Sequence, residues 1–358
     1  MERRTGARSA ALALVVLVAV GCTVDPSPEA APTPTSDSAS TTEPTPSPEP
    51  TSSPSESASP PPHPISMAAL AAAELTGGDL RLGRVREQTA SFTSYDVTFS
   101  STTAGAGTRP LTISGVLNVP RGRGPFPAVV LAHGYIDPAY YVRGQGMTRE
   151  RGFLADRGFV ALHVDYRNHA ESSDDPRVNT AVRLGYAADV VAAVHALRKS
   201  PDVGVDPDRI ALFGRSMGGG VVQKVLAAEP GLVVAGVAWA SVSSLEAENF
   251  LHFNARDAAD AELRAELRDR HGLPAEDPEF WRNLSVRPAF DEITEPVLMV
   301  HGRYDDTCPP RWARATQRAM VEAGVDSTLE WYDDGHAFGP AFFAAMDRTV
   351  RFLRARMG

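Results

Sequence analysis

The chain carries its clearest structural signal in the stretch Arg209-Ile210-Ala211-Leu212-Phe213-Gly214-Arg215-Ser216-Met217-Gly218-Gly219-Gly220. Residues 209–213 form a short apolar run, which indicates a buried strand, and a helical stretch from Val221 to Ala228 follows. Ser216 is therefore predicted to lie on a tight strand-to-helix turn. Such a turn exposes a serine hydroxyl, and the flanking glycines avoid the crowding that larger residues would cause. We interpret Ser216 as a candidate nucleophile.

Two further polar residues follow apolar strands downstream of this serine. The strand 297–301 precedes Gly302-Arg303-Tyr304-Asp305, and the strand 328–332 precedes Asp333-Asp334-Gly335-His336. Parallel sheets carry their chemistry at the carboxyl ends of their strands. We therefore expect Asp305 and His336 to lie close to Ser216.

The chain from about Thr93 to its C-terminus resembles α/β-hydrolases of the prolyl oligopeptidase type, and it is similar also to the dienelactone hydrolase and acetyl esterase branches. The motifs that carry the resemblance are His133-Gly134-Tyr135, Asp165-Tyr166-Arg167, Gly214 to Gly219, His301 to Asp305 with Cys308-Pro309, and Gly335-His336. The resemblance implies an α/β fold with a mostly parallel central sheet and helices on both faces. It also puts the acid four residues after His301, which favours Asp305 over the alternative, Asp306.

This resemblance and the order Ser, Asp, His predict one mechanism. Ser216 would be the nucleophile, His336 its base, and Asp305 the residue that orients the imidazole. The backbone N–H groups of Met217 and Tyr135 would form the oxyanion hole, and whether the Tyr135 hydroxyl also contributes stays open. The mechanism needs no metal or organic cofactor, and the other histidines show no metal-ligand spacing.

The expected function is hydrolysis of acyl ester or peptide bonds in small esters or short peptides. Only a short lead precedes the predicted sheet, which disfavours a gated oligopeptidase with a propeller and leaves a carboxylesterase or acetyl esterase as the alternative. A dienelactone hydrolase would need a cysteine in place of Ser216. A surface protein that binds a ligand without turnover is the candidate from a different class.

Residues 1–22 are predicted to be an export signal of the lipoprotein type. Three arginines precede the apolar stretch Ala10–Val20, whose eleven residues are too few to span a bilayer. Val18-Ala19-Val20-Gly21-Cys22 resembles a bacterial lipobox, in which Cys22 would be lipidated. An ordinary cleaved signal is the alternative. We therefore expect an exported protein that is lipid-anchored to the cell membrane and faces away from the cytoplasm.

Residues 23–64 consist almost wholly of Pro, Ser, Thr, Ala and acidic residues, with six carboxylates and no Lys or Arg. Such a composition predicts a disordered stalk, because it offers too little apolar surface to offset the entropy of ordering. The chain as a whole carries a formal net charge of −9, which predicts no nucleic-acid partner.

Residues 65–358 are predicted to form one catalytic domain. Antiparallel strands are expected at 92–99 and 111–119 and a short helix at 67–77. The parallel strands are expected at 128–132, 159–164, 209–213, 233–239, 297–301 and 328–332, and the helices at 146–157, 181–199, 219–228, 311–323 and 341–356. The long connection 244–291 predicts a small helical cap. Its aromatic residues Phe250, Phe253, Phe280 and Trp281 either line a pocket or anchor the cap.

Three further residues are expected to have no part in the catalytic mechanism. Arg143 and Arg167 are candidates for binding a substrate carboxylate, but we favour solvated positions at the surface. Cys308 is expected to be a buried packing residue.

Overall fold

The computed structural model describes residues 61–103 and 109–358. Within these ranges nine strands form one sheet in the order β1-β2-β3-β5-β4-β6-β7-β8-β9. The strands are β1 (Gly78–Gln88), β2 (Phe92–Thr102), β3 (Pro110–Pro120), β4 (Phe126–Ala132), β5 (Val160–Val164), β6 (Val205–Arg215), β7 (Gly236–Trp239), β8 (Val297–Gly302) and β9 (Ser327–Tyr332). The predicted signal at 1–22, with Cys22, and the predicted stalk up to residue 60 lie outside the described residues.

The sheet is mostly parallel, as predicted. β1, β2, β3 and β5 pair antiparallel, whereas the pairs from β5 through β4, β6, β7 and β8 to β9 are parallel. All five residues of β5 and most of β4 are buried. Strands that are covered on both faces read as continuous apolar runs, which is why these strands were recognisable in the sequence.

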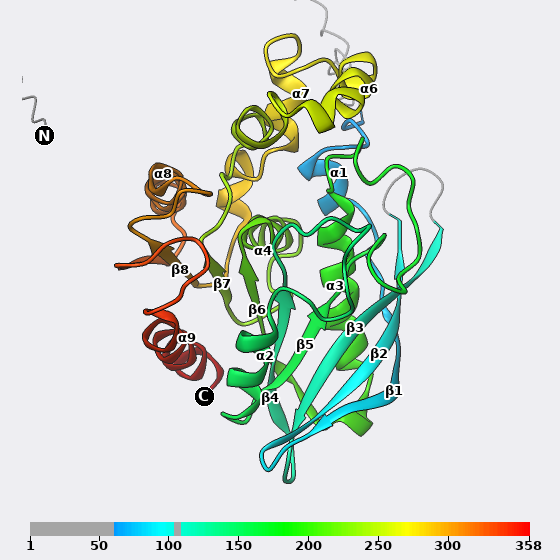
Figure 1. Cartoon of the computed structure of the whole chain (residues 1–358), viewed down its shortest axis with the longest axis vertical. Coiled ribbons are helices and arrows are strands. Elements are labelled where there is room, and N and C mark those ends of the chain that lie inside the picture. Colours follow the sequence, from blue (N-terminus) through cyan, green and yellow to red (C-terminus); the bar gives the residue numbers. More distant parts are fainter. Residues whose placement is uncertain (1–60, 104–108) are drawn as a thin grey trace, which may run out of the picture. The chain divides into compact units, whose positions relative to one another are not determined.

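Helices cover both faces of the sheet (Figure 1). Val129 and Leu131 of β4 pack with α2 (Thr148–Ala155) and α9 (Phe342–Met357). Val130 points to the opposite face, whose core also contains residues of α3 (Gly185–Arg198), α4 (Met217–Ala228) and α8 (Pro310–Glu322). Neighbouring residues of a strand point to opposite faces, so β4 contributes to two separate cores. The prediction of an α/β sheet covered on both sides is confirmed.

The long connection between β7 and β8 is helical over residues 246–292. It contains α5 (Glu246–Asn249), a π-helical turn at Phe250–Asn254, α6 (Ala261–His271) and α7 (Pro278–Leu284), with short 3-10 turns at Ala258–Asp260 and Arg287–Glu292. In Figure 1 the yellow helices α6 and α7 stand clear of the sheet. The side chain of His252 hydrogen-bonds the backbone oxygen of Thr307 (3.1 Å), so the insertion contacts the loop that follows β8.

Two expectations for residues 67–88 need correction. The helix α1 is shorter than predicted and covers only Met67–Ala71. The strand β1 was not predicted, because almost all of its residues are exposed and it has no buried face to create an alternating pattern. Among the described residues, no helix has the length and hydropathy needed to cross a membrane.

Candidate active site

Ser216 lies on the predicted turn between β6 and α4. Its backbone adopts φ 58° and ψ −123°, a strained conformation for a residue with a side chain. Its N–H donates to the Trp239 oxygen (2.9 Å), and its own carbonyl accepts the N–H of Gly219 (2.9 Å). These bonds from β7 and α4 hold the strained turn in place.

Glycine is required on both sides of the serine. A Cβ atom on Gly214 would lie 2.0 Å from the Gly218 oxygen, and a Cβ on Gly218 would lie 1.9 Å from the Ala132 oxygen. Gly134 faces the serine from the end of β4, because a Cβ there would lie 3.1 Å from the Ser216 Cβ. The glycines therefore permit a close approach of β4, β6 and α4 around Ser216.

The three predicted catalytic side chains form one chain of hydrogen bonds. The Ser216 hydroxyl donates to Nε2 of His336 (3.1 Å), and Nδ1–H of His336 donates to the Asp305 carboxylate (2.9 Å to Oδ2 and 3.1 Å to Oδ1). Ser216 directly follows β6, Asp305 lies in the loop after β8, and His336 lies in the loop after β9. Neighbouring parallel strands thus bring together residues that are up to 120 positions apart.

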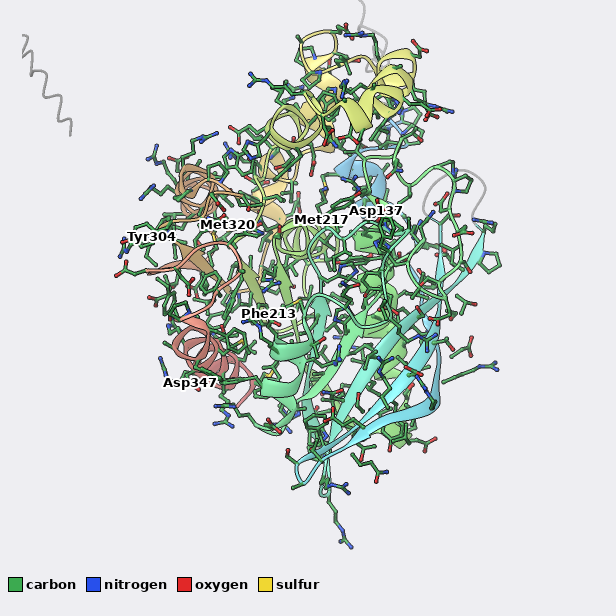
Figure 2. All side chains as sticks on the ribbon, viewed as in Figure 1. Asp137, Phe213, Met217, Tyr304, Met320 and Asp347 are labelled. Carbon is green, nitrogen blue, oxygen red and sulfur yellow. The ribbon has the colours of Figure 1, made fainter. Side chains whose placement is uncertain are left out.

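The carboxylate that contacts His336 is that of Asp305. It is buried and accepts the backbone N–H groups of Thr307 (3.0 Å) and Cys308 (2.7 Å). Asp306 is exposed, and its carboxylate accepts the hydroxyl of Thr307 (3.3 Å). Tyr304, just before this pair, points outward at the edge of the molecule, away from Met217 at the start of α4 (Figure 2). Alternate residues thus face opposite sides of this loop.

A second histidine supports the same carboxylate. His301 donates from Nε2 to the Cys308 oxygen (2.9 Å), and this nitrogen also lies 3.3 Å from Oδ2 of Asp305. Burial lowers the pKa of His301 below its ordinary value, which keeps the ring neutral. His301 therefore fixes the turn that carries Asp305.

The loop that carries His336 is tied to α2. Arg149 donates to the oxygens of Phe338 (3.1 Å) and Ala337 (2.8 Å). Arg215, next to Ser216, donates to the Glu150 carboxylate (3.1 Å), and Glu150 is only 1% exposed. Two arginines and one buried carboxylate thus connect the serine turn, the histidine loop and α2.

The predicted oxyanion loop, which contains Tyr135, follows β4 and is held by hydrogen bonds from the loop after β5. The Tyr166 hydroxyl donates to the His133 oxygen (3.1 Å), and Nε2 of His169 donates to the Ile136 oxygen (3.2 Å). These contacts fix the backbone on either side of Tyr135. In the part of the chain that the structure describes, the N–H groups of Tyr135 and Met217 have no protein acceptor. Both are therefore available to an oxygen atom of a ligand.

Cys308 is buried as predicted, but it also contacts the site. Its Sγ lies 4.0 Å from the Ser216 Oγ. Burial, together with the charge of Asp305, raises the pKa of this thiol to about 12. The thiol is therefore un-ionised at neutral pH and is a poor nucleophile.

The expectation that Arg143 and Arg167 are solvated was wrong. Arg167 is 2% exposed and binds Asp189 (2.9 Å) and Asp175 (3.1 Å). Arg143 has a side chain that is 15% exposed and binds Glu171 (2.7 Å). Both guanidinium groups therefore bind carboxylates of the protein itself.

The aromatic residues of the insertion serve mainly as anchors. Phe250 packs on Trp281 with ring centroids 4.9 Å apart, and Phe280 stacks on His271 at 4.4 Å. Phe250, Phe280 and Trp281 are buried, whereas Phe253 is 36% exposed beside Trp312. Of the two interpretations that the sequence left open, the contacts favour anchoring for the three buried rings.

Four residues near the site were not recognised from the sequence. Arg149 and His169 bind backbone oxygens far away in the chain, and Glu150 binds the side chain of the distant Arg215, so local patterns carry no signal for them. Arg183 was also missed, although its guanidinium lies over the Tyr135 ring at 4.7 Å.

The fold and the hydrogen-bonded serine, histidine and aspartate define a serine hydrolase of the α/β-hydrolase class. The model of the prolyl oligopeptidase family matches residues 146–355, and the chain belongs to this family. The matched range includes Ser216, Asp305 and His336, whereas Tyr135 precedes it.

Individual relatives cover part of the chain. Dipeptidyl peptidase 4 of Felis catus is 31% identical over 180 residues, 48% of this chain and 21% of that protein. Prolyl endopeptidase FAP of Homo sapiens is 30% identical over 193 residues, 51% of this chain and 23% of that protein. The chain thus spans about a fifth of the length of these curated relatives.

Solved structures share the fold at low identity. Acetyl xylan esterase 1 from Thermoanaerobacterium sp. JW/SL YS485 superimposes with a TM-score of 0.59 at 21% identity. The match covers 81% of this chain and 92% of the esterase. At this identity the similarity concerns the fold alone.

Proposed function

We propose that the chain hydrolyses acyl ester or peptide bonds through Ser216, His336 and Asp305, with a covalent acyl-enzyme. The observation that carries the proposal is the unbroken chain of hydrogen bonds from the Ser216 hydroxyl through His336 to Asp305. Membership of the prolyl oligopeptidase family supports the same reaction class.

In the first half-reaction His336 activates the serine. A serine hydroxyl is a weak nucleophile at neutral pH and needs an adjacent base. Nε2 of His336 takes the hydroxyl proton as Oγ attacks the carbonyl carbon, and then delivers this proton to the leaving oxygen or nitrogen. Asp305 keeps Nδ1 protonated and stabilises the imidazolium that forms.

The developing negative charge requires stabilisation at the carbonyl oxygen. The free N–H groups of Met217 and Tyr135 are suited to this, and Met217 is also the first residue of α4. The positive end of the helix dipole therefore adds to the field at the oxyanion. Water activated by His336 then hydrolyses the acyl-enzyme.

Two substrate classes follow from the relatives. The family and the dipeptidyl peptidase relatives favour a peptide bond, and an ester is the alternative suggested by the fold shared with acetyl xylan esterase 1. Both reactions use the same triad and acyl-enzyme, so substrate assays must separate them.

The proposal is tested with a fluorophosphonate probe and with panels of 4-nitrophenyl esters and Xaa-Pro peptide anilides. Ser216→Ala should abolish labelling and lower kcat at least about 1,000-fold, and His336→Ala should cause a similar loss of turnover. Ser200→Ala is the matched control, since its hydroxyl donates to Ala196 within α3. Activity that survives both triad substitutions would contradict the proposal. A folded chain without labelling would instead favour a binding protein.

A further inference from the structure

Arg183 lies beside the oxyanion loop, immediately before α3. Its guanidinium carbon is 4.7 Å from the centroid of the Tyr135 ring, which is 55% exposed. The backbone N–H of Tyr135 is a proposed oxyanion donor, and its neighbour Gly134 faces Ser216. Arg183 is therefore connected to the reacting centre through one residue.

Within residues 61–103 and 109–358, Arg183 has no carboxylate partner and its side chain makes no hydrogen bond. It is nevertheless partly buried. The arginines Arg143 and Arg167, which the sequence suggested as carboxylate ligands, are occupied by Glu171 and Asp189. Arg183 thus has the free donors that those two lack.

The backbone at this position is strained. Val182 and Arg183 have φ of 47° and 58°, the left-handed region that disfavours β-branched and long side chains. The conformation is held by bonds from the Arg183 N–H to the Val178 oxygen (2.8 Å) and from the Val182 N–H to the Asn179 oxygen (3.0 Å). Strain of this kind persists only where its surroundings enforce it, and it is concentrated at functional sites.

The oxyanion loop itself contains one acidic residue after Tyr135. Asp137 lies two residues after Tyr135, and its carboxylate accepts the N–H of Ala139 (2.9 Å). It forms no ion pair with Arg183 in the described structure. A guanidinium that stacks on a ring by one face keeps its N–H edge free for two parallel bonds to a carboxylate.

We propose that Arg183 forms an anion-binding subsite that binds a carboxylate of the substrate while Ser216 attacks the acyl carbon. This rests on the function proposed above and narrows the substrate class to acyl compounds that carry a negative charge. The carboxylate belongs either to the acyl group or to the leaving group, and these are two arms of one test.

The test compares matched charged and neutral esters on the intact chain. The acyl arm pairs 4-nitrophenyl hydrogen glutarate with 4-nitrophenyl valerate, and the leaving-group arm pairs 4-acetoxybenzoate with 4-methylphenyl acetate. The quantity measured is the ratio of kcat/KM for the charged ester to that for the neutral one. Intrinsic reactivity cancels when this ratio is compared between variants.

In Arg183→Gln the ratio should fall about tenfold or more in one arm, because a charge-assisted pair is lost. Arg183→Lys should retain only part of the ratio, since the charge remains but an ammonium group cannot form the two parallel bonds. Arg123→Gln is the control for the loss of a positive charge, because Arg123 is exposed and precedes the amino end of β4, opposite the site. An equal loss on charged and neutral esters, or an unchanged ratio in both arms, would overturn the subsite.

Binding without turnover separates this proposal from the one on which it rests. Glutarate should bind to Ser216→Ala in calorimetric titrations, and about tenfold more weakly to the double variant with Arg183→Gln. Equal binding would refute the subsite even if the enzyme is active. If fluorophosphonate labelling fails but glutarate binding depends on Arg183, the proposed hydrolysis is wrong and the subsite stands.

Discussion

Asp305 accepts more hydrogen bonds than the orientation of His336 alone requires. Besides the imidazole, two backbone N–H groups reach its carboxylate, and His301 lies 3.3 Å from Oδ2. Together these contacts hold the buried carboxylate in one position beside His336. The same turn leaves Asp306 exposed, so two adjacent aspartates have different environments.

This difference predicts unequal effects of two matched substitutions. Asp305→Asn should lower kcat by roughly 10,000-fold, because an amide cannot hold His336 in the required tautomer and charge state. Asp306→Asn should change kcat by less than about threefold, within the range of surface changes. Steady-state kinetics with one 4-nitrophenyl ester measures both. The reverse ranking would transfer the acid role to Asp306.

At the scale of elements, the geometry of the triad depends on how the His336 loop joins α2. Glu150 is buried between Arg215 and Arg149, and the two arginines hold the backbone oxygen of Ala337. A buried carboxylate that loses its charge leaves its arginine partner without compensation. The loop after His336 would then lose part of its support.

We therefore expect Glu150→Gln to lower the free energy of unfolding by roughly 1–3 kcal/mol and to lower kcat more than KM. Glu171→Gln is the matched control, because Glu171 also binds an arginine but is 65% exposed. Glu171→Gln should lower the free energy of unfolding by less than about 1 kcal/mol, because an exposed ion pair contributes little. Urea unfolding and steady-state kinetics measure the two effects. Equal effects in the two variants would show that the network does not support the loop.

At the scale of the whole molecule, the described part of the chain buries two histidines in neutral form, His133 and His163, close to the oxyanion loop. Burial, followed by the charge of His169, lowers the pKa of His133 to about 3, and burial lowers that of His163 well below its ordinary value. Both side chains are fully buried. At mildly acidic pH these two rings therefore stay unprotonated in the folded state, whereas the same rings bind protons in the unfolded chain.

The consequence is a loss of stability that begins at mild acidity. Between pH 6.5 and about 3 the unfolded state binds more protons than the folded state, so stability falls as pH falls. His133 alone contributes up to about 1.4 kcal/mol per pH unit in this window. The stabilisation from Asp96 and Asp175, whose pKa values are lowered, is lost only at lower pH, below the ordinary aspartate pKa.

Urea unfolding at pH 7.5, 6.0 and 5.0 measures this dependence. His133→Gln should reduce this slope, because it removes a histidine that is buried in neutral form. A free energy of unfolding that stays constant between pH 7.5 and 5.0 would contradict the neutral burial of these rings.

The order of most elements and the candidate triad could be predicted from the sequence. Buried parallel strands are continuous apolar runs, and the turn at Ser216 needs glycines at fixed positions, so both are local signals. The exposed strand β1 lacked such a signal and was missed. The lipidation of Cys22 and the stalk stay predictions.

Which side chains contact one another could not be predicted from the sequence and is seen in the folded structure. Asp305 rather than Asp306 contacts His336, and Arg167 forms an ion pair with Asp189. Arg183 lies over Tyr135 and has no counter-ion among the residues that the structure describes. Each of these depends on loops that come together from distant parts of the chain at the carboxyl ends of the strands. The sequence shows that a residue is charged, but it does not show whether the partner of that charge is a distant loop, a ligand or water. The packing of the folded chain settles which of these partners the charge has.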